Sequence, residues 1–336
     1  MKQLTKMPID IVIPWVDGSD LAWQQRRSQH VSLPEHESVD QRYRDFGTLK
    51  YLLRSIAQYA PWVNKIYLVT DQQRPSFIKD SKRLVVVDHT SFIPNEYLPT
   101  YNSNVIELNC WRIPGLNEHF ILLNDDFLFT NPVWPSDFFT ADGEKVVDMT
   151  SQFLLMPRDD FAHTAVNNMT LINREFSKRE WLFTNWPAAF SLRNGVRIGL
   201  LSSLLSILPY FTRFYDHHLA IPFLKSSFMN GYSLYEREVT KMALTNKQRQ
   251  VTDISVWLMR YYQILTGCVK PRSYKFGRYL EIQDVDAVKR LFRSRVKITK
   301  MVVLNDTVTT LAQETAALTT MKILEQHFAN KSNYEK

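Results

Sequence analysis

The amino-acid sequence predicts an α/β fold, with a mostly parallel, Rossmann-like sheet core and a large helical region after it. Short apolar runs rich in Val and Ile alternate with helical patterns over the first 130 residues. Several of these runs end in Asp or Asn, as is common where ligands bind at the carboxyl ends of strands. After about residue 140 the apolar spacing becomes helical. Because alternating strands and helices form parallel sheets, the first half is predicted to hold the sheet.

The first elements follow from apolar periodicity. Residues 9–16 form a predicted buried strand that ends in the turn DGSD at 17–20. From Thr48 an apolar stripe at helical spacing predicts a helix that Pro61 ends. Two short β-branched runs, at 66–70 and 84–87, are predicted strands, and an Asp follows each of them.

The next elements lead to the most polar strand end in the chain. Asn104, with Glu107 three residues later, resembles a capping box that begins a short helix. The run HFILLNDDF at 119–127 then predicts a buried strand that ends in the triplet NDD. Two adjacent carboxylates at such a place repel each other unless a cation or a catalytic base uses their charge. We therefore expect a ligand or metal site at this strand end.

The second half is predicted to be a separate, mainly helical lobe. We divide the chain into an α/β core at 1–155, with one or two last strands within 146–156, and a helical lobe at 156–336. Asp253 is the predicted N-cap of a helix that Gly267 ends. A last helix at about 308–328 is predicted to bury four apolar residues, namely Leu311, Leu318, Met321 and Leu324.

Composition limits the class of protein. The hydrophobic content of 45% is sufficient for a packed core. The two cysteines, Cys110 and Cys268, are far apart and favour neither a disulfide framework nor a zinc site. The first apolar run is interrupted by Pro14 and is too short for a signal peptide, and no run reaches the length of a spanning helix. A cytoplasmic protein is expected.

Positive charge gathers between residues 270 and 300, which hold ten Lys or Arg against three Asp or Glu. Such a run attracts phosphates, anionic lipid or nucleic acid, and a solvated helical face is the simpler alternative. Nucleic acid is not expected, because no nucleic-acid-binding motif accompanies the run. The apolar segment 196–211 lies between Arg193 and Arg213. It predicts either a buried helix, which we favour, or a helix on an anionic membrane surface.

Four polar groups of residues together indicate phosphoryl transfer. They are the turn at 17–20, the motif RYRD at 42–45, the triplet NDD at 124–126, and a downstream set of His217, His218, Lys225, Arg249 and Asp253. Carboxylates share Mg²⁺ with substrate phosphates, and arginines neutralise phosphate oxygens. A positioned base takes the proton of the attacking hydroxyl. Each group alone also has a structural explanation as a turn, a helix cap or a solvated surface.

The sequence resembles the Stealth family of sugar-phosphate transferases, which includes bacterial capsule polymerases and the lysosomal-enzyme GlcNAc-1-phosphotransferase. The resemblance covers most of the chain in four blocks: IDIVIPWVDGSD at 9–20, the long block that starts RYRDFGTLK at 42–78, the block at 101–129 that continues to HLAIPFLK at 218–225, and RQVTDISVWLMRYYQILTG at 249–267. It implies a GT-A-like core that binds a nucleotide sugar, with a helical lobe that completes the active site through His218 and Arg249.

The resemblance also implies a reaction. A hexose 1-phosphate would move from a UDP-hexose or UDP-N-acetylhexosamine to a hydroxyl of an oligosaccharide acceptor, including a lipid-linked one at the inner face of the bacterial membrane. Attack on the β-phosphorus would release UMP and leave a phosphodiester, in capsular or other surface polysaccharide synthesis. Two alternatives stay open: a conventional GT-A glycosyltransferase that releases UDP, and a non-catalytic protein that binds carbohydrate or a membrane surface.

The resemblance assigns the reaction centre to the NDD triplet and His218. Asp126 matches the expected base or metal-proximal carboxylate, Asp125 is expected nearer the metal, and Asn124 supports them. Mg²⁺ or Mn²⁺ is the implied cofactor. His218 matches the family's H-x3-P block and is expected to bind or protonate phosphate oxygens. Ala220 replaces the first Pro of the bacterial H-x-P-x-P pattern.

The remaining roles concern the donor. Arg249 matches the Arg that begins the family's last block and is expected to clamp the diphosphate, with Asp253 holding that Arg in place. The nucleotide and diphosphate are expected to contact residues of the first two blocks, namely Asp10, Asp17, Gly18, Arg42, Arg44 and Asp45.

Overall fold

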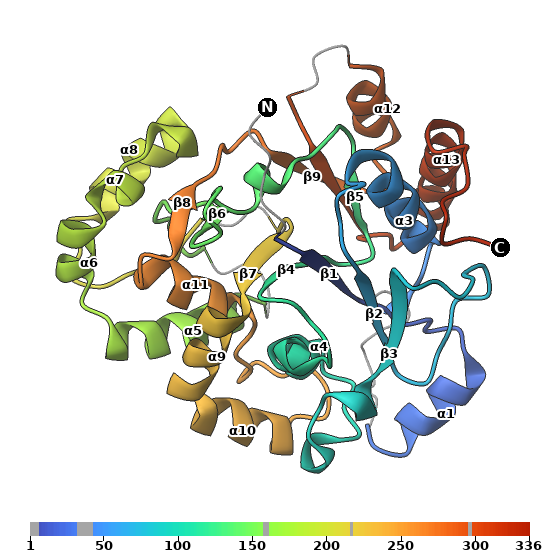
Figure 1. The fold of residues 1–336 in the computed structure, drawn as a ribbon, viewed down its shortest axis with the longest axis horizontal. Coiled ribbons are helices and arrows are strands. Elements are labelled where there is room, and N and C mark those ends of the chain that lie inside the picture. The colour runs from blue at the N-terminus through green and yellow to red at the C-terminus, as the bar shows by residue number, and fades with distance from the viewer. Residues whose placement is uncertain (1–6, 32–42, 157–160, 216–217, 295–297) are drawn as a thin grey trace.

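A five-stranded sheet forms the centre of the molecule (Figure 1). The structure is a computed structural model and describes residues 7–31, 43–156, 161–215, 218–294 and 298–336. The strand order is β3-β2-β1-β4-β7. The strands are β1 (Ile9–Pro14), β2 (Ile66–Thr70), β3 (Leu84–Asp88), β4 (His119–Leu122) and β7 (Ile221–Leu224). The first four run parallel and β7 runs antiparallel to β4, so the predicted α/β fold with a mostly parallel sheet is confirmed.

A second, smaller sheet begins directly after the carboxylate triplet. It contains β5 (Phe127–Phe129), β10 (Met301–Asn305) and β9 (Gly277–Glu281). Strand β10 is antiparallel to β5 and parallel to β9. A further pair joins β6 (Val146–Asp148) to β8 (Val269–Pro271). The second half of the chain therefore supplies strands to every sheet, and the division near residue 155 stays a prediction.

Helices surround these sheets. In the first half they are α1 (Leu21–Ser28), α3 (Thr48–Tyr59) and α4 (Ser103–Asn109). In the second half they are α5 (Phe161–Glu175), α6 (Lys178–Thr184), α7 (Trp186–Ala189), α8 (Val196–Leu205), α9 (Lys225–Leu234), α10 (Glu236–Thr245), α11 (Trp257–Leu265), α12 (Val285–Arg293) and α13 (Leu311–His327). Helix α3 packs on β5, α11 packs on α5 and α9, and α13 packs on α12 and α3. Within the described residues, no helix combines the length and apolarity needed to cross a bilayer.

Buried ion pairs join distant parts of the chain. Asp148 at the end of β6 accepts from Arg260 of α11 at 2.6 Å and from Arg272 after β8 at 3.0 Å. Both arginines are buried, and they lower the pKa of the Asp148 carboxyl against the effect of burial. Similarly, Arg54 of α3 binds Glu335 near the C-terminus. Pairs of this kind must be complete, because an unpaired buried charge is strongly destabilising.

Two helix boundaries differ from the sequence prediction. Helix α4 is capped by Asn102, whose side chain accepts from the Asn104 N–H, so the capping box of Asn104 and Glu107 is wrong. Helix α11 begins at Trp257 rather than directly after Asp253, and Asp253 is buried instead of capping the helix. In both cases the side chain that was predicted to cap a helix has a distant partner instead, because Asn104 donates to Asp253 at 3.0 Å.

Two apolar helices also expose more surface than periodicity predicts. On α13, Leu311 and Leu318 are exposed, Met321 is half-buried and Leu324 is buried. Helix α8, for which a buried helix was the favoured prediction, exposes three of its six Val, Leu and Ile side chains and buries one of them. The basic run at 270–300 does not form one face either, because Arg272 is buried against Asp148 and Lys300 pairs with Asp137 at 2.7 Å.

Candidate active site

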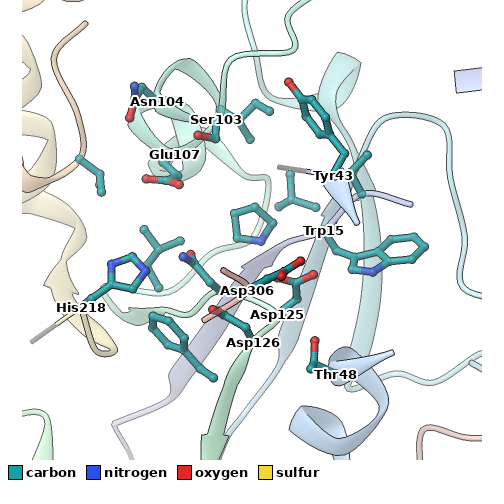
Figure 2. Close-up of a pocket in the computed structure, with 18 of the residues that line it drawn as sticks. Trp15, Tyr43, Thr48, Ser103, Asn104, Glu107, Asp125, Asp126, His218 and Asp306 are labelled. Carbon is teal, nitrogen blue, oxygen red and sulfur yellow. The ribbon is translucent and has the colours of Figure 1, made fainter. Parts of the chain in front are cut away.

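A cavity of about 670 Å³ lies at the carboxyl ends of β1 to β4. The first half of the chain lines it with the residues after these strands and with the first turns of α3 and α4. The second half closes it with His218, Arg249, the start of α11 and the ends of β9 and β10. Figure 2 shows Asp125, Asp126 and Asp306 near the centre of this cavity, with His218 and Glu107 on one side and Tyr43 and Trp15 on the other. The site therefore needs both halves of the chain.

The predicted strand at 119–127 is divided where its carboxylates stand. Strand β4 ends at Leu122, and β5 begins at Phe127 in the other sheet. The backbone between them is fixed on both sides, because the Leu123 N–H donates to Val12 of β1 at 3.0 Å and the Leu304 N–H of β10 donates to Asp126 at 3.1 Å. The turn thus directs Asp125 and Asp126 into the cavity from a rigid support.

Burial is the main electrostatic influence on this pair. It raises the pKa of Asp126 to about 7. It also raises the pKa of Asp125 well above the usual range, with further contributions from the negative charges of Asp126 and Asp45. The Oδ1 atom of Asp126 is buried and accepts no hydrogen bond from the described residues. Such an arrangement is costly for two charged carboxylates unless a cation or a donor group completes it.

These residues fit a divalent cation that is shared with a substrate. Mg²⁺ is usually held by one or two carboxylates together with phosphate oxygens and water, rather than by a cage of protein ligands. Among the residues that the structure describes, no three His, Cys, Asp or Glu side chains are close enough to hold a metal ion by themselves. Asp125 and Asp126 supply the two carboxylates, and the open side of the turn faces the cavity.

An ion pair between Arg44 and Asp306 joins the two ends of the chain at the cavity. Arg44 donates to both carboxylate oxygens of Asp306, at 2.7 and 2.6 Å, and to the Val308 carbonyl at 2.9 Å. Both residues line the cavity, so the structure brings the predicted Arg44 to the site. Asp306 was missed from the sequence, because it follows β10 far from every polar motif. A carboxylate directly after an apolar strand was nevertheless a signal of the same kind as NDD.

Glu107 is a second residue that sequence reasoning did not assign to the site. It lies on α4, lines the cavity and faces Arg249 closely enough for that Arg to lower its pKa in part. Burial is the larger influence and raises the pKa of Glu107 to about 7. Arg249 is exposed and donates from Nε to the Ser103 hydroxyl at 2.7 Å. A Glu inside a short helix gives no sequence signal beyond helix formation, and here it was taken for part of a cap.

His218 lies on the segment that enters β7 and lines the cavity. Its φ of 50° is in the left-handed region, which a non-glycine residue adopts rarely and mainly where the surroundings enforce it. The imidazole packs edge-to-face on Phe127 and Tyr279, with ring centroids 5.6 and 6.0 Å apart. The structure thus brings His218 beside the turn that carries Asp126, while His217 lies outside the described residues.

An aromatic wall forms another side of the cavity. It consists of Trp15, Trp23, Tyr43 and Tyr101. Gly18 makes this packing possible, because a Cβ there would lie 2.4 Å from the Tyr43 carbonyl oxygen. The Gly18 N–H donates to that same carbonyl at 3.0 Å. Gly18 therefore supports the wall without lining the cavity.

Two other predicted residues of the first blocks also stand behind this wall. Asp45 accepts from the Trp15 indole at 3.0 Å and from the Gly47 N–H at 2.6 Å. Asp17 accepts from the Ser19 N–H and hydroxyl at 2.9 and 2.6 Å. Neither residue lines the cavity, so both position the loops that carry the wall. Arg42, the remaining predicted residue of these blocks, lies outside the described residues.

The structure places two predicted site residues away from the cavity. Asp10, at the start of β1, is buried and accepts from Asn64, Lys65 and Asn117 at the opposite end of the strand. Asp253 is also buried and does not bind Arg249 as expected. Its carboxylate instead accepts from three Asn side chains, those of Asn102, Asn104 and Asn246. It therefore fixes the loop before Arg249 to the start of α4.

Known protein families match the same regions of the chain. Residues 7–29 match "Stealth protein CR1, conserved region 1", and residues 42–147 match "Stealth protein CR2, conserved region 2". An exopolysaccharide phosphotransferase, cps2G of Lactiplantibacillus plantarum, is 39% identical over 91% of this chain and 89% of its own length. The chain belongs to the Stealth family. The predicted family and the predicted phosphotransferase class are therefore confirmed.

Other relatives of this Stealth protein carry similar names. The receptor polysaccharide phosphotransferase WefC of Streptococcus gordonii is 36% identical over 97% of this chain and 98% of its own length. The capsular polysaccharide phosphotransferase WcwK of Streptococcus pneumoniae is 37% identical over 82% of this chain and 84% of its own length. Among solved structures, the galactosyltransferase LgtC in complex with donor and acceptor sugar analogues covers 93% of this chain and 95% of its own, at 10% identity and a TM-score of 0.41.

Proposed function

We propose that this Stealth protein transfers a hexose 1-phosphate from a UDP-sugar to a hydroxyl of a glycan acceptor during bacterial surface polysaccharide synthesis. The observation that carries the proposal is the pair Asp125 and Asp126, which is directed into a cavity built by both halves of the chain. The polysaccharide phosphotransferases among its relatives support the reaction class. The donor is a UDP-hexose or UDP-N-acetylhexosamine, and the acceptor is an oligosaccharide, including a lipid-linked one at the inner face of the membrane.

The cavity offers separate surfaces for the two ends of such a donor. The aromatic wall around Tyr43 and Trp23 suits the uracil ring, because base–aromatic stacking needs only a flat apolar face. On the other side, Arg249 and His218 suit the diphosphate, since a guanidinium and an imidazole both donate hydrogen bonds to phosphate oxygens. In Figure 2 Asp126 lies between His218 on one side and Tyr43 and Trp15 on the other, and the β-phosphorus would lie next to it.

The transfer step uses Asp126 as the base. The acceptor hydroxyl oxygen attacks the β-phosphorus and forms the new O–P bond, while its proton passes to Asp126. The bond between the β-phosphorus and the bridging oxygen breaks, and that oxygen leaves with UMP. The hexose stays bound to the transferred phosphate, so the product is a phosphodiester. A base that works near neutral pH is efficient when its own pKa lies close to that pH.

A divalent cation resolves the charge conflict in this cleft. A diphosphate placed against Asp125 and Asp126 costs a few kcal/mol for each close pair of like charges, even at an effective dielectric constant of about 20. Bound Mg²⁺ or Mn²⁺ would neutralise the diphosphate and polarise the phosphoryl oxygens, with Asp125 as its nearer carboxylate. Arg44 also lines the cavity, but its charge is balanced by the bidentate ion pair with Asp306, so it does not replace the cation.

A two-step experiment tests the proposal. Thermal-shift measurements with Mg²⁺ and a panel of UDP-sugars identify the donor, since a ligand at 100 times its Kd stabilises the fold by about 2.7 kcal/mol. Phosphorus NMR of the reaction product with that donor then identifies the new bond. A phosphodiester signal is expected. A product without phosphorus, formed with release of UDP, would instead identify a conventional glycosyltransferase. No turnover of any nucleotide would favour a binding protein.

A further inference from the structure

Exposed apolar side chains gather on the α6–α8 region. Eight large apolar side chains on it are between 63% and 86% exposed, namely Phe183, Trp186, Leu192, Val196, Leu200, Leu204, Ile207 and Tyr210. We call this set the α8 surface. Monomeric proteins rarely expose so many large apolar residues together unless something binds them. Figure 1 shows α6, α7 and α8 at one end of the molecule, far from α12 and α13.

The α8 surface is built to face outward. Val196, Leu200, Leu204 and Ile207 follow each other at the spacing of one helix face, and this is the face that solvent reaches. The opposite side of α8 is anchored, because the Ser202 hydroxyl accepts from the Gln152 N–H at 3.0 Å. An amphipathic helix that packs on a protein core buries its apolar face instead.

A buried lysine fixes the end of the same helix. Lys178 donates to the carbonyl oxygens of Leu205 and Tyr210 at 2.6 and 3.0 Å, and burial lowers its pKa to about 8. These bonds satisfy carbonyl groups that a helix end otherwise leaves without partners. The apolar face of α8 is therefore presented on a firm support, and its exposure is part of the fold.

Charge distinguishes the kind of partner that this surface fits. Between residues 181 and 213 the sequence contains no Asp or Glu but three arginines. Arg193 and Arg197 are exposed at the start of α8. Lys275 lies beside them, because Tyr274 next to it packs against Gly195 and donates to the Arg193 carbonyl. Glu180 of α6 is the single Asp or Glu between residues 176 and 213. A surface of exposed Leu, Phe and Trp with mainly basic neighbours is typical of a helix that lies in the headgroup region of an anionic bilayer.

We propose that the α8 surface docks this protein on an anionic phospholipid bilayer, with the apolar side chains inserted and the basic residues at the headgroups. A second copy of the chain is a poorer occupant, since two such faces would bring their positive charges together. This inference goes beyond the transfer reaction and does not depend on it. Docking of this kind would bring the protein to the membrane that holds a lipid-linked acceptor.

Vesicle co-sedimentation of the purified full chain tests the proposal. Vesicles of phosphatidylcholine alone are compared with vesicles of phosphatidylcholine mixed with phosphatidylglycerol, at low and high salt. The wild-type chain is expected to bind the mixed vesicles, and more weakly at high salt. The double variant Leu200→Glu/Leu204→Glu should lose about tenfold or more in affinity, because both side chains lose their insertion into the acyl region. Its matched control is Leu311→Glu/Leu318→Glu on the exposed face of α13, which should bind as the wild type does.

A second variant keeps the test decisive if the first fails to fold. Arg193→Ala/Arg197→Ala leaves the apolar stripe intact and should bind roughly tenfold more weakly to the mixed vesicles, with little change on phosphatidylcholine. Equal binding of the wild type and both variants would overturn the proposal. So would a stable dimer by light scattering that Leu200→Glu/Leu204→Glu dissociates, in a protein that binds no vesicles. The readout is binding alone, so failure here leaves the transferase proposal unaffected.

Discussion

At the scale of single residues, the site depends on carboxylates that the fold holds in an unfavourable setting. Asp126 is partly buried, has an oxygen without a partner among the described residues, and lies next to another carboxylate. Such a setting is maintained by the hydrogen bonds of the turn to β1 and β10. The pair therefore costs stability, which is more typical of functional sites than of structural ones.

Replacing Asp126 tests its role as the base. Asp126→Asn keeps the shape and removes the ability to accept a proton, so kcat should fall about 10²–10⁴-fold while the circular dichroism spectrum and Tm are retained. The exposed Asp142→Asn is the matched control and should keep full activity. Turnover of Asp126→Asn close to that of the wild type would remove Asp126 from the role of base.

Removal of divalent cations tests whether the carboxylate pair binds a metal ion during the reaction. Exhaustive treatment with EDTA should abolish turnover, and Mg²⁺ or Mn²⁺ added back should restore it, because the diphosphate otherwise meets Asp125 and Asp126 without a cation. Initial rates of nucleotide release measure the effect. Full activity in EDTA would contradict the proposed cation.

Glu107 should make the fold less stable as the pH rises. Its folded pKa of about 7 lies above the ordinary value of 4.5, so between these pH values the folded state binds more protons than the unfolded state. Glu107→Gln cannot lose a proton. Relative to the wild type, its free energy of unfolding should be nearly unchanged near pH 4.5 and about 1–3 kcal/mol higher at pH 8. Urea denaturation across this range, with exposed Glu144→Gln as control, measures the difference. A difference that does not vary with pH would contradict the raised pKa.

At the scale of elements, apolar runs predicted the strands well and polar partners were harder to predict. The strands β1, β2 and β3 lie where their β-branched runs predict them, and Thr48 begins its helix as expected. The split between β4 and β5 was missed, because one apolar run serves two sheets and only tertiary pairing divides it. Asp253 was assigned to a local cap because two of its partners, Asn102 and Asn104, lie about 150 residues earlier.

Asp253 and Arg249 should separate stability from activity. Asp253→Ala leaves three Asn side chains and the Gln250 N–H without their buried acceptor, and should lower the free energy of unfolding by about 2–4 kcal/mol. Arg249→Ala removes an exposed side chain, so stability should change by about 0.5 kcal/mol or less.

Arg249→Ala should lose activity even though it keeps its stability. Loss of a charged donor to the diphosphate should reduce kcat/KM about 10–100-fold at unchanged Tm. Chemical denaturation and steady-state kinetics on both variants provide the comparison. A destabilised Arg249→Ala with normal kcat/KM would show that Arg249 serves the fold instead.

At the scale of the whole molecule, the two halves of the chain build one site. Strand β7 completes the central sheet, and β10 joins β5 directly after the carboxylate turn. Of the residues that line this site, NDD, His218 and Arg249 were recognisable from the sequence, while Asp306 and Glu107 were not. The first group lies in polar motifs of the blocks that resemble a family. Asp306 lies outside those blocks, and Glu107 lies inside one of them but in a helix where it resembled a cap.

The identity of the released nucleotide tests the central proposal most directly. With a UDP-sugar that stabilises the protein, an acceptor glycan and Mg²⁺, chromatography of the reaction mixture measures UMP and UDP against each other. Attack on the β-phosphorus predicts UMP, in an amount equal to the phosphodiester formed. Release of UDP with transfer of the sugar alone would contradict the account.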